Sequence, residues 1–144
     1  MTKMIHSYWA YIVLFTLIFA VVNAIMGLTS KREFTTTNLR IALFTLIASH
    51  IQLILGFIAY YASSYYEVMR AEGMGEIMKN SDLRKILIEH PLVGMIAIAL
   101  ITIGFSKHKK KSTDAAKFKT FAVFYGIALL LIFSRIPWTQ WLSN

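Results

Sequence analysis

The sequence predicts an all-α integral membrane protein, built as an up-down bundle of four helices, from three observations. Of its 144 residues, 57% are hydrophobic and 15% are charged, whereas soluble domains carry about 25% charged residues. Mean hydropathy is correspondingly high, at +0.59. Four apolar runs follow one another along the chain, and a helix of about 20 such residues crosses the hydrocarbon core of a bilayer. We therefore expect a single transmembrane domain over residues 1–144.

Each helix is predicted from its own apolar run. The first run, 8–28, lacks the cleavage pattern of a signal peptide and is too long for one, so we expect it to stay in the protein. The second and fourth runs, 41–62 and 118–136, are long enough to cross the membrane by themselves. The third, 91–106, reaches spanning length if its helix begins at the cap-forming Ser81 and Asp82. The expected helices cover residues 7–29, 38–68, 82–107 and 115–137.

The charged residues predict which side of the membrane each loop faces. Segment 107–119 has six lysines against one aspartate, and segment 29–40 is also basic, whereas segment 63–90 has a slight acidic excess. By the positive-inside rule, loops 29–40 and 107–119 are cytoplasmic and both termini lie outside. The net charge of +8 therefore indicates orientation and contact with membrane lipid. A nucleic-acid partner is not expected, because the lysine run lacks interleaved aromatic residues. His108 should be solvated among these lysines.

Very few polar side chains interrupt the apolar runs, and those that do are the candidate functional residues. The absence of cysteine excludes disulfides, thiolate iron–sulfur clusters and covalently attached c-type haem. His50 lies in the middle of the second run, among leucine, isoleucine and phenylalanine, with few candidate hydrogen-bond partners. Such an apolar wall with one nitrogen donor suits a porphyrin, which helical bundles hold between histidines on separate helices. Asn23 and Gln52 are expected to join helices by hydrogen bonds.

His90 opens the deeply buried part of the third helix. Pro91 has no amide to bond the carbonyl of Leu87, so we expect a kink there. Gly94 and Ala97 follow at helical spacing. This groove of small residues would let a flat macrocycle approach the backbone, and it would equally serve close packing of helices.

Depth in the bilayer limits which histidines can meet. At about 1.5 Å per residue, His50, His90 and His6 lie roughly 16, 24 and 33 Å from the inner edge. The arithmetic permits either His50–His90 or His6–His90 and disfavours His6–His50. Arg135, at roughly 27 Å by the same rise, lies near the depth of His90. Its cation needs an anion, and a haem propionate, Glu89 and lipid phosphate are the three candidates.

The chain resembles the small four-helix bacterial membrane proteins commonly labelled "cytochrome B". The resemblance runs through nearly the whole chain, and its most distinctive segments are Glu89-His90-Pro91-Leu92 and Arg135-Ile136-Pro137-Trp138. Its other motifs are His6-Ser7-Tyr8, Ser49-His50-Ile51-Gln52-Leu53 with Gly56, Met78-Lys79-Asn80-Ser81 with Leu83-Arg84, Leu100-Ile101-Thr102-Ile103-Gly104 and Thr113-Asp114-Ala115-Ala116-Lys117-Phe118-Lys119. The resemblance implies a b-type haem with His50, His90 and His6 as candidate ligands, in a multi-pass protein of the bacterial cytoplasmic membrane.

From these observations we expect a membrane b-type cytochrome that transfers single electrons at the outer side of the membrane. His50 and His90 are the first-choice axial ligands of one haem b, with His6 as the alternative ligand, Gly94 beside the macrocycle and Arg135 on a propionate. A second haem is not excluded. Quinone and a larger respiratory complex are the candidate partners, and Trp138 and Gln140 could frame a quinone.

Two other functions stay open. One is a non-haem metal or quinone oxidoreductase that uses His6, His90 and Glu89. The other is a structural or assembly subunit of a larger membrane complex, without a cofactor. The sequence does not decide whether the protein is an enzyme.

Overall fold

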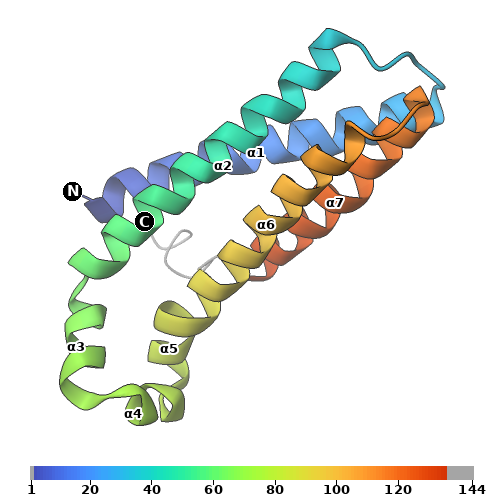
Figure 1. Ribbon diagram of the computed structural model, residues 1–144. Helices are drawn as coiled ribbons and strands as arrows, with labels where there is room; N and C mark the ends of the chain where they lie inside the picture. Colours follow the sequence, from blue (N-terminus) through green and yellow to red (C-terminus); the bar gives the residue numbers. More distant parts are fainter. Residues whose placement is uncertain (1, 136–144) are drawn as a thin grey trace.

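A computed structural model of the chain shows an all-α fold, which confirms the predicted fold class (Figure 1). It describes residues 2–135, apart from the side chains of residues 2, 3, 86 and 135. The long helices are α1 (Thr2–Thr29), α2 (Thr36–Ala62), α6 (His90–His108) and α7 (Asp114–Arg135). Between α2 and α6 lie three short helices and a π-helical turn: α3 (Ser64–Glu72), α4 (Met74–Lys79), α5 (Ser81–Arg84) and η1 (Lys85–Glu89).

Within residues 2–135, four helical stretches are long and apolar enough to cross a membrane, so the chain is a multi-pass membrane protein by length and composition. They are Met4–Thr29, Thr36–Ala62, Ser81–His108 and Asp114–Ser134. Their outward faces carry large apolar side chains, such as Phe15, Phe19 and Leu130, as a helix surrounded by lipid requires. The third stretch reaches spanning length because α5, η1 and α6 continue one another.

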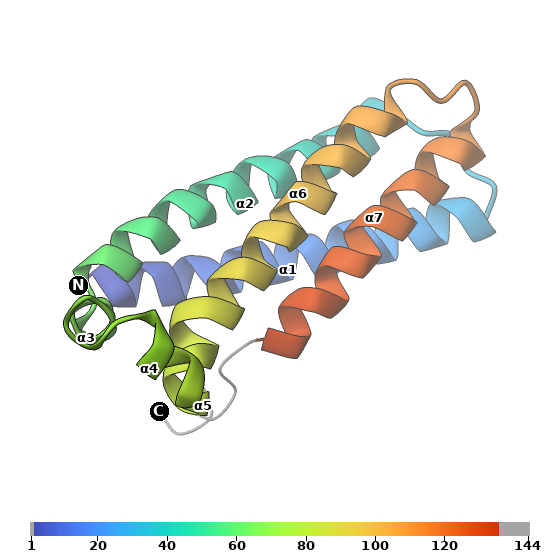
Figure 2. The same ribbon diagram turned by 60° about the horizontal axis from the view of Figure 1, so that its bottom comes forward.

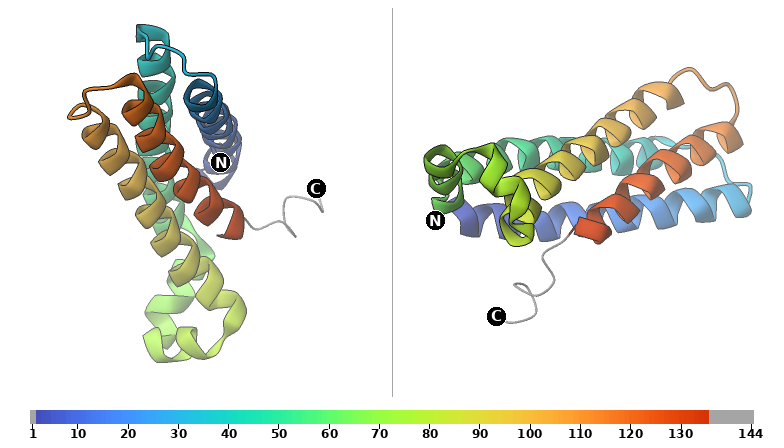
Figure 3. Two further views of the ribbon diagram at one scale, coloured as in Figure 1. Left: turned by 90° about the vertical axis from the view of Figure 1, so that its right-hand side faces the viewer. Right: turned by 90° about the horizontal axis from the view of Figure 1, so that it is seen from below.

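The helices form two antiparallel hairpins, α1–α2 and α6–α7, that pack side by side (Figures 2 and 3). Helix α1 contacts α2 and α7, and α6 contacts α7 and α2, so α1 and α6 occupy one diagonal of the bundle. The connections 30–35 and 109–113 lie at one end, here called the loop end, together with both basic segments (Figure 1). Helices α3 to α5 close the other end, here called the cap end.

Two polar caps set the boundaries of the helices around the cap end. The Ser63 hydroxyl accepts a hydrogen bond from the amide of Tyr66, so α2 ends at Ala62 and a separate helix begins, in place of one helix to residue 68. The Asn80 side chain accepts from the amides of Asp82 and Leu83, so the N-cap lies one residue before the expected Ser81.

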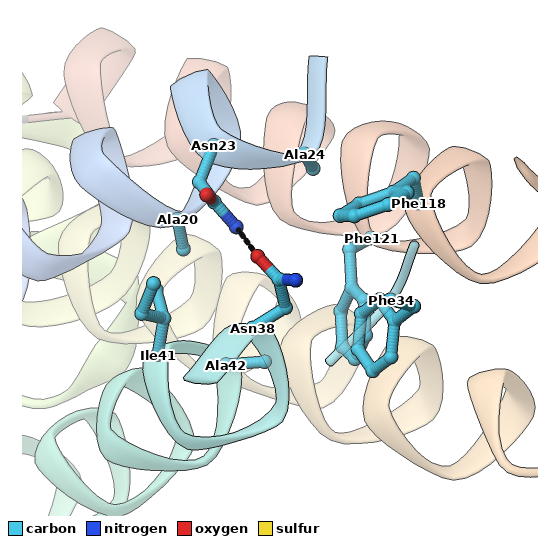
Figure 4. Close-up of a pocket in the computed structure, with 9 residues that line it drawn as sticks. All are labelled: Ala20, Asn23, Ala24, Phe34, Asn38, Ile41, Ala42, Phe118 and Phe121. Atoms are coloured by element: carbon cyan, nitrogen blue, oxygen red, sulfur yellow. Dashed lines mark hydrogen bonds between the residues drawn. The ribbon is translucent and has the colours of Figure 1, made fainter. Parts of the chain in front are cut away.

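The bundle is joined most closely at its loop half. A core of small and aromatic side chains fills it, and Tyr125, fully buried on α7, donates a 2.9 Å hydrogen bond to the carbonyl of Ala42 on α2. Asn23 on α1 donates to the Asn38 side chain at 2.8 Å, as expected of an intramembrane amide. Figure 4 shows this pair beside a small pocket of about 10 Å³, about enough for one water molecule.

Candidate functional site

His6 and His90 face each other across the bundle at the cap end. His6 lies near the start of α1, His90 is the first residue of α6, and the two helices occupy opposite corners. The centroids of the two imidazole rings are 6.3 Å apart, and the ring planes make an angle of 79°. The His6 side chain is half-buried and that of His90 is exposed. Of the two pairings that depth allowed, the structure brings together His6 and His90.

Local structure around Pro91 positions His90. Because Pro91 offers no amide, the chain widens into the π-helical turn η1 directly before His90. The carbonyl of Leu87, which would have accepted from residue 91, accepts instead from the hydroxyl of Tyr60 on α2 at 3.0 Å. The expected break in the helix is therefore a π turn, and a tyrosine of the neighbouring hairpin completes its hydrogen bonding.

Helix α2 positions His6 through two residues one turn apart. The Gln52 side chain donates a 3.1 Å hydrogen bond to the backbone carbonyl of His6. At Gly56, a Cβ atom would lie 3.2 Å from Cε1 of the His6 ring, which is closer than ordinary contact. Residues four apart share one face of a helix, so Gln52 and Gly56 together form the surface on which His6 lies.

Within the described residues, Nδ1 of His6 and Oε1 of Gln52 are buried in this contact and meet no partner at full hydrogen-bond geometry. Leaving such a group unpaired typically costs about 1–3 kcal/mol. Nδ1 belongs to the ring of His6, a candidate ligand, and Oε1 is the side-chain carbonyl oxygen of Gln52, which contacts His6. Their chemistry is complementary, because a protonated Nδ1 donates to a carbonyl.

His50 lies at a different level of the bundle. Its Nδ1 is 2.9 Å from the carbonyl of Leu46, and its Nε2 is 3.3 Å from the hydroxyl of Thr102 on α6. Thr102 follows His90 by twelve residues, which corresponds to about 18 Å along a helix. The structure therefore places His50 beside Thr102 and away from the level of His90. Sequence reasoning missed Thr102 because a partner on another helix leaves no signal near His50.

The residues expected beside the macrocycle occupy different surroundings. Gly94 lies one turn after His90, and a Cβ there would meet no atom within 4 Å, so it borders open space. Ala97, the next member of the expected groove, is fully buried in the core and serves helix packing. Arg135 is the last residue of α7, and its side chain lies outside the described part, as do Trp138 and Gln140.

Among the described residues, the metal-binding side chains that meet at the cap end are the imidazoles of His6 and His90. The carboxylate of Glu89, a candidate third ligand, pairs with the Arg84 guanidinium at 2.9 Å. Among residues 2–135, the structure brings no three His, Asp or Glu side chains together to hold a metal ion. The site can therefore supply two nitrogen donors, one from each hairpin.

His108 is buried, with 4% of its surface exposed, and the expectation that it is solvated was wrong. The connection 30–35 returns Phe34 to the bundle, so that the His108 ring packs between Phe34, Phe105 and Phe121. Its Nδ1 bonds to the carbonyl of Phe105. This histidine closes the loop end of the core, far from the His6–His90 pair.

Gln52 and Gly56 are the residues whose place at the site the sequence alone did not reveal. Their i, i+4 spacing was visible, but nothing in the sequence indicated that this face of the second helix would meet His6. Comparison with family models, with curated proteins and with solved structures finds no match to this chain.

Proposed function

We propose that the protein is a membrane b-type cytochrome in which His6 and His90 hold one haem b at the cap end. The distance between their rings carries this proposal. A metal–imidazole bond is about 2 Å long and the ring centroid lies roughly 1 Å beyond the nitrogen, so two imidazoles on opposite sides of one metal have centroids about 6 Å apart. The rings of His6 and His90 have centroids 6.3 Å apart.

The number of donors also favours haem over a bare metal ion. A protein site for a bare transition metal needs three or four side-chain ligands. A porphyrin supplies four nitrogen donors of its own, so haem needs only one or two axial side chains. Two imidazoles from separate helices, without a third ligand among the described residues, fit the second case.

The surroundings of His6 also fit a residue that would hold such a group. Histidines that bind metals usually donate their second ring N–H to a carbonyl or carboxylate, which fixes the tautomer and the ring orientation. If Nδ1 of His6 donates to Oε1 of Gln52, both unpartnered atoms are satisfied and Nε2 keeps its lone pair. In this proposal His6 and His90 bind the group, Gln52 orients His6, and Gly94 leaves room beside the backbone.

Bound at this site, haem would supply reversible one-electron oxidation and reduction. The chain's own residues would hold the group between the two hairpins. Because the loop end carries both basic segments, we place it in the cytoplasm and the cap end at the outer side of the bacterial inner membrane. Quinone, or a protein of a larger respiratory complex, is then the partner that the outer face would serve.

The test is a reduced-minus-oxidised spectrum of the purified protein, with the haem measured as its pyridine haemochrome. We expect a b-type α band, which His6→Ala and His90→Ala each abolish or shift strongly. His108→Ala serves as the matched control, because this buried histidine lies at the opposite end, and the band should survive it. A protein that is colourless and binds no added haem would refute the proposal.

His50→Ala distinguishes the two pairings that depth allowed. If His6 and His90 are the ligands, this variant keeps the band, because His50 bonds to Thr102 at another level. Loss of the band in His50→Ala, with retention in His6→Ala, would move the haem to the His50–His90 pair.

A further inference from the structure

A second feature, separate from the histidines, is an open groove between α1 and α2 on the outside of the bundle. It has a volume of about 530 Å³, within the range of small-molecule sites. Its walls include Phe15, Phe19 and Phe44, which expose 70%, 60% and 56% of their surfaces. The loop end of the groove is formed by Thr37 and Arg40. The groove thus combines a long apolar wall with one cation at its mouth.

The floor of the groove offers methyl groups and no free hydroxyl. The hydroxyl of Thr16 donates to the carbonyl of Val13 at 3.0 Å. That of Thr45 lies 2.9 Å from the carbonyl of Ile41 and 3.2 Å from that of Thr16. Because both hydroxyls are turned to backbone carbonyls, this floor suits a hydrocarbon chain better than a polar ring.

The Arg40 guanidinium is available to an anion. Arg40 is exposed near the start of α2, whose first turn contains no acidic residue. The ion pairs among the described residues join Glu76 to Lys79 and Glu89 to Arg84, and within the same residues no hydrogen bond engages the Arg40 side chain. A guanidinium at the edge of a membrane span binds phosphate through paired N–H groups.

The length of the groove matches one leaflet of a bilayer. From Thr37 at the mouth to Thr45 at the floor is eight residues of α2, or about 12 Å along the helix. Half of a hydrocarbon core about 30 Å thick is about 15 Å. A lipid with its headgroup at the loop end would therefore place most of one acyl chain in the groove.

We propose that this groove binds one anionic phospholipid of the loop-end leaflet, with its phosphate on Arg40 and an acyl chain along Phe15, Phe19 and Phe44. The cytoplasmic leaflet, where the basic loops place this end, is the one rich in anionic lipid. The site does not depend on haem, because it lies on the opposite half of the bundle from His6 and His90.

The experiment is native mass spectrometry of the purified protein, titrated in neutral detergent with phosphatidylglycerol or phosphatidylcholine of identical chains. One molecule of phosphatidylglycerol should bind with about fivefold preference, the contribution of one basic residue near a membrane surface. Arg40→Gln should abolish the preference, and Arg40→Lys should restore part of it. Lys110→Gln is the matched control, because it removes an exposed cation from the other loop and should leave the preference unchanged.

A second pair of variants tests the apolar wall. Phe15 and Leu130 are equally exposed, at 70% and 69%, but only Phe15 lines the groove. Phe15→Ala should weaken binding of both lipids, and Leu130→Ala should change neither. Equal binding of the two lipids, an unchanged preference in Arg40→Gln, or displacement of the phospholipid by a lower concentration of isoprenoid quinone would each overturn the proposal.

Discussion

Gly104 on α6 allows α6 and α7 to pack closely. We predict the loss of stability that follows when alanine replaces it. A Cβ at residue 104 would lie 2.5 Å from Cβ of Phe124 on α7, whereas ordinary contacts begin at 3.4 Å. The Cβ of Phe124 is fixed to its backbone, so the two helices would have to separate by about 1 Å, a form of overpacking that typically costs about 1–3 kcal/mol. Gly104→Ala should therefore destabilise the α6–α7 contact.

Gly126→Ala on α7 is the matched control, because a Cβ there would meet no atom within 4 Å. Both substitutions replace a glycine inside a helix and gain up to about 1 kcal/mol of helix propensity. The difference between the two variants therefore isolates the cost of the clash, and Gly104→Ala should be less stable by about 1–3 kcal/mol. Reversible unfolding by denaturant in detergent micelles, followed by circular dichroism, measures it. Equal stability of the two variants would refute the reasoning.

Two further predictions concern single hydrogen bonds. Tyr125→Phe removes the 2.9 Å bond to the Ala42 carbonyl between the hairpins and should lower the free energy of unfolding by about 0.5–1.5 kcal/mol; an unchanged value in the same assay would contradict this role. If His6 and His90 hold a haem as proposed, Gln52→Leu should reduce its affinity about 10–100-fold, because the side chain proposed to orient His6 is lost. In a potentiometric titration, Gln52→Leu should raise the midpoint potential and Gln52→Glu should lower it, since a more basic ligand favours the oxidised iron; no change in either variant would refute the role of Gln52.

Much of the fold could be predicted because hydropathy is a local property of the chain. The apolar runs predicted four long helices, and each run coincides with one of the candidate spans. The interruption at Ser63 was harder to predict, because the apolar and aromatic pattern continues past it and only the serine cap ends the helix. Pro91 signalled a break correctly, but the hydrogen bond that completes the π turn comes from Tyr60, a residue of another helix.

The site could be predicted only as a set of alternatives. Counting residues from the inner edge gives each histidine a depth, but each helix end adds an error of several residues. The register between hairpins is decided by contacts such as that of Tyr125 with the Ala42 carbonyl, which hydropathy does not encode. His108 shows the same limit, because its burial follows from the return of Phe34 to the core.

The placement of His6 and His90 on different hairpins has a consequence for biogenesis. Helices α1 and α2 can enter the membrane as a pair while the ribosome is still synthesising the rest of the chain, and helices associate after they are inserted. His6 is then present from the beginning, but its counterpart arrives only with the third span. Any group held by both histidines must therefore be acquired after the second hairpin has docked, so its incorporation would report that assembly is complete.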